Sequence, residues 1–180
     1  LAGFGRIGIT YTTENYSVAK RIAILLKRYL NCKPQISITE VSQFGGRKTC
    51  RLRLDEHASE RLLTSLQMMR TADRALLMNH LPKGARTRAC CRRAFARGLF
   101  LGCGTMSKPE SSYHLCFRCA GNIKKANTWY KMLAQSDIIT RIAPSPDGAV
   151  LYSKKAETVS TFLGVVCASA SLLHFENVLA

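Results

Sequence analysis

The feature that most constrains the fold is an order of predicted elements that occurs twice along the 180-residue chain. Helical periodicity and strand-like alternation predict a helix, a strand, a returning strand and another helix in each half. These elements fall at 16–30, 35–41, 48–54 and 56–69, and again at 123–135, 138–143, 150–153 and 157–163. A duplication of this kind predicts an α+β protein whose two repeats are related by a pseudo-two-fold axis, with Cys50 in the position of Val150.

The two copies differ at their beginnings. A helix over 90–101 and a strand over 112–119 open the second copy, whereas the chain starts at Leu1 inside the corresponding motif of the first. We therefore expect a first repeat at 1–69 with a truncated opening helix, a linker at 70–88 with a short helix near 72–79, and a second repeat at 89–180.

Residue spacing predicts which faces of these elements are buried. In the strand over 48–54, Cys50 and Leu52 share one face, and Arg51 and Arg53 share the other. In the helix over 16–30, the predicted inward residues recur at helical spacing. They are Val18, Ile22, Leu25, Leu26 and Tyr29. In the helix over 90–101 and just after it, Gly98 and Gly102 lie four apart, where small residues let another helix approach closely.

Charge favours a polyanionic partner. The chain has 27 Lys and Arg against 11 Asp and Glu, a formal net charge of +16. Such a balance favours nucleic acid, and the alternative is a charge that serves solubility alone. No apolar run approaches the roughly 20 residues that cross a bilayer, and no signal peptide is visible, so we expect no membrane partner.

The eight cysteines favour packing over metal binding. Most lie among apolar neighbours, which is typical of buried reduced thiols. Cys116 and Cys119 have the spacing of a zinc knuckle, but no second Cys or His pair supplies the other two ligands. On a strand these two side chains also point to opposite faces, so we predict no metal site.

Two segments carry a family resemblance. Leu1-Ala-Gly-Phe-Gly5 and Phe95-Ala-Arg-Gly-Leu-Phe-Leu-Gly-Cys-Gly104 resemble the LAGLIDADG helix motif of homing endonucleases. The longer stretch from Cys90 to Leu115 resembles the core signature of the WhiA family of bacterial transcription regulators, and Thr13-Glu-Asn15 and Leu172-Leu-His-Phe-Glu176 fit the same family. The resemblance implies two pseudo-two-fold-related αββαββα repeats with saddle-like antiparallel sheets and motif helices packed together. It also implies a C-terminal helix-turn-helix domain that is absent from this chain.

The resemblance also bears on catalysis. A LAGLIDADG nuclease needs a carboxylate near the bottom of each motif helix to hold a divalent metal. In this chain the acidic positions of the motif are occupied by Phe4, Leu101 and Cys103. We call these three residues the degenerate motif positions. Neither an apolar side chain nor a thiol replaces a carboxylate for Mg²⁺. We therefore predict no enzyme activity, no catalytic residue, no metal and no cofactor.

The saddle implied by the resemblance indicates which residues would bind DNA. Outward strand residues and the turns that link the strands supply Arg47, Lys48, Arg51, Arg53, His114, Arg118, Lys154 and Lys155. Cys116 shares the face of His114 and Arg118. The alternative is that these are solvated residues of a domain that no longer binds DNA.

The resemblance implies a non-catalytic domain of a DNA-binding transcription regulator of sporulation and cell-division genes. Its expected partner is double-stranded DNA at promoters, its expected place is the cytoplasm at the nucleoid, and another transcription factor is a further candidate partner. One alternative is a protein- or ligand-binding scaffold that positions the helix-turn-helix domain. Another is an active homing endonuclease, which the residues at the degenerate positions disfavour.

Overall fold

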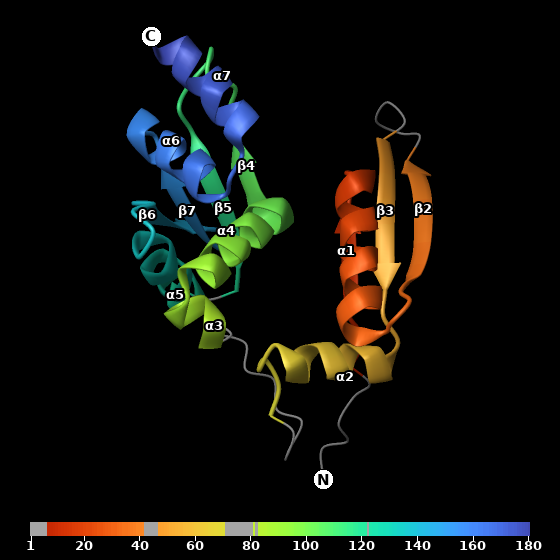
Figure 1. The fold of residues 1–180 in the computed structure, drawn as a ribbon. Helices are drawn as coiled ribbons and strands as arrows, with labels where there is room; N and C mark the ends of the chain where they lie inside the picture. The colour runs from red at the N-terminus through yellow and green to blue at the C-terminus, as the bar shows by residue number, and fades with distance from the viewer. Residues whose placement is uncertain (1–6, 42–46, 71–80, 82, 122) are drawn as a thin grey trace. The chain divides into compact units, whose positions relative to one another are not determined.

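A computed structural model describes residues 7–41, 47–70, 81, 83–121 and 123–180 (Figure 1). The chain divides into two compact units, Leu1–Leu77 and Met78–Ala180, and each is described by itself. Both are α+β units with antiparallel sheets. Within the described residues, no helix is long and apolar enough to span a membrane.

The first unit is a three-stranded antiparallel sheet with one face covered by a helix (Figure 1). Its elements are β1 (Thr10–Thr13), α1 (Tyr16–Leu30), β2 (Gln35–Val41), β3 (Arg47–Arg53) and α2 (Glu56–Ser65). The strands lie in the order β1-β3-β2, so β3 is central. The predicted strand faces are confirmed, because Cys50 and Leu52 are buried and Arg51 and Arg53 are exposed.

Helix α1 occupies the range that its periodicity predicted. The side chain of Asn15 caps it by accepting hydrogen bonds from the backbone N–H groups of Ser17 and Val18, and Asn31 ends it in the left-handed conformation. The predicted inward face is partly wrong, because Tyr29 is 71% exposed and Leu25 is 39% exposed.

The row of α1 that meets the sheet runs instead through small residues. Ala19 packs with Cys50 and Leu52, and Ile22 and Ala23 join this cluster. Leu26, one turn further on, packs with a second cluster that includes Leu54 and Ala58. Alanine side chains let the helix lie close to the strands, and this rotates the bulkier Leu25 and Tyr29 away from them.

The second unit has a four-stranded antiparallel sheet in the order β4-β5-β7-β6. Its elements are α3 (Lys83–Thr87), α4 (Ala89–Cys103), β4 (Gly104–Met106), β5 (Leu115–Ala120), α5 (Ile123–Ala134), β6 (Arg141–Ser145), β7 (Gly148–Ser153), α6 (Ala156–Val165) and α7 (Ser169–Leu179). One face of the sheet carries Leu115, Phe117, Cys119, Ala149 and Leu151, all 2% exposed or less. These side chains form the largest apolar core together with residues of α4, α5 and α6.

The duplicated order of elements is present in the sheets. β1, β3 and β2 pair in the same pattern as β5, β7 and β6. The ends of α2 and α6 are built alike, because Gln67 and Cys167 both take a left-handed conformation, with φ of 57° and 58°. This conformation ends α2 at Ser65, before the predicted end at 69.

Two predicted details are corrected. The inward residues that correspond to Cys50 and Leu52 are Ala149 and Leu151, so the match of Cys50 with Val150 is wrong by one residue. β6 begins at Arg141 and not at 138, because Ile138 donates its backbone N–H to the Leu133 carbonyl at the end of α5.

The stretch expected to be a linker contains α3, which contacts α4. A Cβ atom on Gly84 would lie 3.1 Å from the Sγ atom of Cys91, so glycine permits this close approach. The short helix predicted near 72–79 lies outside the described residues.

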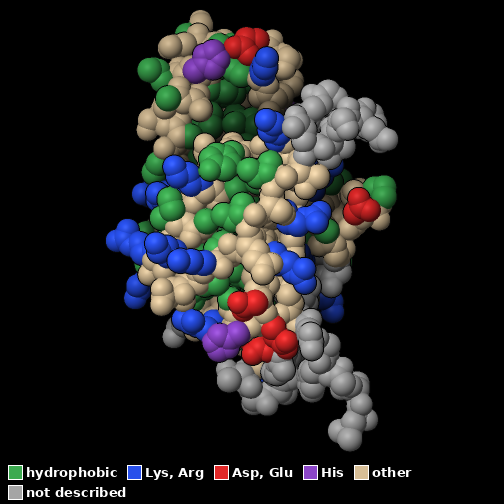
Figure 2. All heavy atoms as spheres, turned by 90° about the vertical axis from the view of Figure 1, so that its right-hand side faces the viewer, with side chains coloured by type: hydrophobic (Ala, Val, Ile, Leu, Met, Phe, Trp, Pro, Cys, Tyr) green, Lys and Arg blue, Asp and Glu red, His purple; other side chains and the backbone are tan. Residues whose placement is uncertain are grey.

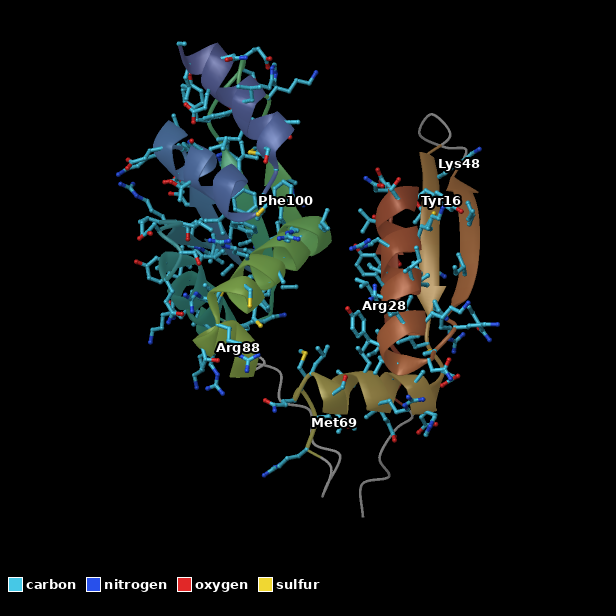
Figure 3. All side chains as sticks on the ribbon, viewed as in Figure 1. Tyr16, Arg28, Lys48, Met69, Arg88 and Phe100 are labelled. Atoms are coloured by element: carbon cyan, nitrogen blue, oxygen red, sulfur yellow. The ribbon has the colours of Figure 1, made fainter. Side chains whose placement is uncertain are left out.

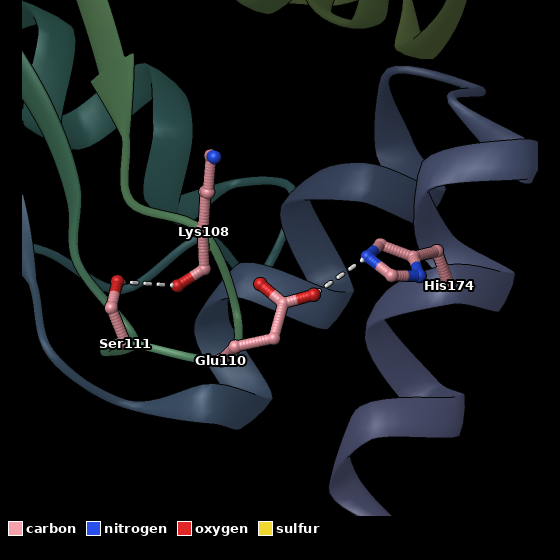
Figure 4. A network of polar contacts seen from close by, with 4 residues as sticks. All are labelled: Lys108, Glu110, Ser111 and His174. Atoms are coloured by element: carbon pink, nitrogen blue, oxygen red, sulfur yellow. Dashed lines mark hydrogen bonds and ion pairs between the residues drawn. The ribbon is translucent and has the colours of Figure 1, made fainter.

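Helix α7 is held to its own unit by polar contacts. His174 Nε2 lies 3.1 Å from Glu110 Oε1, in the loop before β5 (Figure 4). In that loop the Ser111 hydroxyl donates to the Lys108 carbonyl at 2.9 Å. The Ser160 hydroxyl of α6 also donates to Glu176 of α7. The His174 and Glu110 side chains are both more than half exposed, so this pair contributes little stability on its own.

Candidate nucleic-acid interface

The open face of the first sheet is polar and basic. Arg51 lies between Thr12 of β1 and Ser37 of β2, and the next outward row places Arg53 between Thr10 and Gln35. All six residues are exposed. None of the described residues within the strands on this face is acidic, and Thr39 and Thr49 are its other described members. The face therefore presents two arginines among small hydrogen-bonding groups, which suits a phosphate backbone.

The structure corrects the placement of Arg47 and Lys48. Both were expected at the turn that leads into a strand over 48–54, but β3 begins at Arg47, so both lie within it. Lys48 is exposed near the start of β3 (Figure 3). Its register puts it on the face of Cys50 and not on that of Arg51. The side chain of Arg47 lies outside the described part of the structure.

The open face of the second sheet has a single exposed arginine on its central strands. Arg118 of β5 is exposed and faces Val150 of β7. His114 is half-buried just before β5, and its ring stacks on Tyr152 with a centroid separation of 6.2 Å and an interplanar angle of 23°. Cys116 shares this face as predicted, but it is only 7% exposed, so its thiol is not offered to a partner.

Arg141 was not among the predicted binding residues. It is exposed on β6 and lies directly opposite Tyr152 of β7. The alternation of Arg141 with Ile142 is a weak signal, and the predicted strand over 138–143 did not show which residue of the next strand Arg141 faces. Lys154 and Lys155 are exposed and connect β7 to α6, with Lys155 at the N-cap position of that helix.

The degenerate motif positions lie on or near the end of α4. Leu101 is 51% exposed, and Cys103 is half-buried at the last residue of the helix. The Cys103 thiol donates to the Leu99 carbonyl at a sulfur–oxygen distance of 3.2 Å. Burial raises the pKa of this thiol to about 11, Cys119 and Cys116 also raise it, and Lys125 opposes them. Cys103 is therefore a neutral thiol at pH 7, and Phe4 lies outside the described residues.

The two glycines of α4 that were expected to contact another helix, Gly98 and Gly102, have free space around them among the described residues. A Cβ atom on Gly98 or on Gly102 would meet no atom within 4 Å among the described residues. The segment expected to pack there, Leu1–Gly5, lies outside the described residues. The close packing of two motif helices stays a prediction.

Metal ligands do not gather anywhere in the part of the chain that the structure describes. No group of three or more His, Cys, Asp or Glu side chains is placed to hold an ion there. Cys116 and Cys119 lie on opposite faces of β5, as the alternation predicted, and all eight cysteines are free. The strand geometry explains why the zinc-knuckle spacing does not form a chelate.

Among the charged side chains in view in Figure 2, basic ones are more frequent than acidic ones. Lys and Arg appear at many separate places, whereas Asp and Glu appear at only a few. This distribution agrees with the net charge of +16. A surface of this kind attracts a polyanion at long range, and the attraction weakens as salt rises.

The family model of the WhiA LAGLIDADG-like domain matches residues 92–180. A "Probable cell division protein WhiA" from Brevibacillus brevis is 31% identical over 98% of this chain and 55% of its own length. A protein of the same name from Alkaliphilus metalliredigens is 28% identical over 99% of this chain and 56% of its own length. The chain thus spans about half the length of the curated relatives it matches.

Solved structures share the fold. Full-length DUF199/WhiA from Thermatoga maritima superposes with a TM-score of 0.66 and 17% identity, over 96% of this chain and 52% of that one. The homing endonuclease I-WcaI, solved bound to its DNA recognition sequence, gives a TM-score of 0.60 and 14% identity, over 93% of this chain and 73% of that one. At these identities the likeness establishes the LAGLIDADG fold alone.

Proposed function

We propose that this chain, which belongs to the WhiA family, is a domain of a transcription regulator that binds duplex DNA without cutting it. The observation that carries the proposal is the open face of the first sheet, where Arg51 and Arg53 stand in consecutive outward rows and none of the described strand residues is acidic. The nearest described carboxylates, Asp55 and Glu56, follow β3 and line a cavity with Arg53. Regulation of cell-division and sporulation genes, promoter DNA as partner and a place at the nucleoid belong to the same proposal.

We propose that the chain does not cleave DNA because of two side chains on the motif helix α4. Leu101 is apolar, and Cys103 is a neutral thiol whose pKa is raised to about 11. Mg²⁺ prefers carboxylate and water oxygens, and neither side chain supplies one. The nuclease-type metal clamp is therefore not expected to assemble at this helix.

The salt dependence of DNA affinity tests the proposal. If Arg51, Arg53 and Arg118 each contact a phosphate, log K should fall against log salt with a slope of about −2.7 or steeper, at about 0.9 per contact. Fluorescence anisotropy with a labelled duplex between about 50 and 200 mM salt gives the slope. Undetectable binding at the lowest salt would contradict a DNA-binding role for this domain.

One observation favours a second candidate function, a protein-binding scaffold that positions the helix-turn-helix domain. Ile36 and Ile38 are neighbours on β2, on the face of Cys50 and Leu52, yet they are 52% and 57% exposed. Exposed apolar neighbours on a sheet are typical of interaction surfaces. The same anisotropy experiment separates the two functions, because a scaffold needs no affinity for DNA.

A further inference from the structure

The second unit contains a basic cavity at the junction of β6, β7 and α6. It has a volume of about 360 Å³ and is lined by residues 139–141 and 152–155. Three of these residues are cations, Arg141, Lys154 and Lys155, and none is acidic. Within the described part of the chain, no ion pair engages these three side chains. Three unneutralised cations around one cavity favour an anion.

The first unit has a cavity in the equivalent place, and that cavity contains acidic residues, which the second cavity lacks. That cavity, of about 420 Å³, is lined by Gln35 and Arg53, which pair across β2 and β3 as Arg141 and Tyr152 pair across β6 and β7. Its other charged residues are Asp55 and Glu56. Asp55 Oδ1 accepts the Ala58 N–H at 2.7 Å and caps α2. The carboxylates of Asp55 and Glu56 therefore provide the negative charge in the first cavity.

Helix α6 has no such cap. Lys155 stands at its N-cap position and makes no side-chain hydrogen bond to the helix. The N–H groups and the dipole of a ten-residue helix favour negative charge at this end, and the one acidic residue of its first turn, Glu157, does not line the cavity. Charge and helix end thus point to the same kind of ligand.

A buried hydroxyl gives an independent indication. Thr140 is one of the lining residues, is 5% exposed, and its Oγ1 atom has no hydrogen-bond partner among the described residues. Buried hydroxyls are normally paired, so an unpaired one beside a basic cavity indicates a missing acceptor. An oxygen-rich anion would provide that acceptor.

We propose that this cavity is a phosphate-binding site in which Arg141, Lys154 and Lys155 supply the charge and Thr140 supplies a hydroxyl donor. Arginine binds phosphate through its planar fork, and lysine binds it as a point charge. The proposal rests on the proposed function only for the source of the phosphate, which is either the backbone of bound DNA or a free phosphorylated small molecule.

Titration of the ¹⁵N-labelled chain with inorganic phosphate and then pyrophosphate, at constant ionic strength set with chloride, tests the site. We expect saturable amide shifts centred on Thr140 and on the start of α6. The triple variant Arg141→Gln, Lys154→Gln, Lys155→Gln should weaken phosphate binding at least about tenfold. The matched control Lys108→Gln, Lys124→Gln, Lys131→Gln removes three exposed charges of the same unit outside the cavity and should leave binding unchanged.

Thr140→Val keeps every charge and nearly the same shape, and it should weaken phosphate binding a few-fold if the hydroxyl donates. Shifts that do not saturate, or that spread evenly over the basic surface, would overturn the proposal. Equal phosphate affinity in the triple variant and its control would overturn it as well.

A duplex added to the phosphate-loaded protein distinguishes the two sources. Reversal of the phosphate shifts identifies the DNA backbone as the source. Phosphate binding that persists in excess duplex identifies a small molecule. If the chain binds phosphate here but has no affinity for duplex, the site stands and the proposed DNA-binding function fails.

Discussion

Replacing Arg51, Arg53 and Arg118 together with glutamine should lower the affinity for duplex DNA about 500-fold at about 0.1 M salt. Each phosphate contact adds about 0.9 to the logarithm of the binding constant for every tenfold decrease in salt below about 1 M, so three lost contacts cost about 2.7 logarithmic units at about 0.1 M. All three arginines are exposed on open strand faces, and none is needed for a core. Anisotropy titration measures the loss, and the salt slope of the variant should be flatter by about 2.7.

A control variant separates these contacts from net charge. Arg21, Arg61 and Lys131 are exposed on α1, α2 and α5, away from the open strand faces. Their replacement by glutamine removes the same charge and should change affinity by no more than a few-fold, because it acts only through long-range attraction. Equal losses in the two variants would show that binding is diffuse and that the open faces have no special role.

Replacing Phe117 with alanine should destabilise the second unit by about 3–5 kcal/mol. Phe117 is fully buried on β5, and its ring meets Phe100 and Phe162 edge-on, with centroid separations of 6.3 and 5.7 Å. The substitution leaves a cavity beneath the sheet and removes two aromatic contacts.

Denaturant unfolding followed by Trp129 fluorescence measures this effect. Trp129 is the single tryptophan and packs against the core of the second unit, so it reports on that unit. Leu173→Ala is the matched control, because Leu173 is 64% exposed and its truncation should change stability by less than about 0.5 kcal/mol. A loss below about 1 kcal/mol for Phe117→Ala would mean that this core is not packed as described.

Local sequence patterns predicted most helices and strands, because a few residues that are neighbours in the sequence determine where such an element begins and which of its faces is buried. Two arginines that alternate with Cys50 and Leu52 determine the face of β3, and Asn15 marks the start of α1. The exposure of Tyr29 could not be predicted, because it depends on how closely alanines allow α1 to approach the sheet. Helical spacing alone does not contain that information.

The candidate site was less predictable because strand register depends on long-range pairing. Arg47 was assigned to the turn before the strand, since the start of β3 cannot be read from Gly45 and Gly46 alone. Arg141 gains its role only from its place opposite Tyr152 and near the two lysines, which lie more than ten residues away in sequence. The nomination of Leu101 and Cys103 rested on family resemblance and not on any physical pattern.

The most direct test of the central claim, that this domain binds DNA without cutting it, is a gel assay on supercoiled plasmid. The chain is incubated with the plasmid in Mg²⁺ and separately in Mn²⁺, and each sample is run before and after digestion of the protein. We predict a retarded complex that returns fully to supercoiled plasmid after digestion of the protein. Nicked or linear plasmid that accumulates with time, and that a chelator prevents, would contradict it.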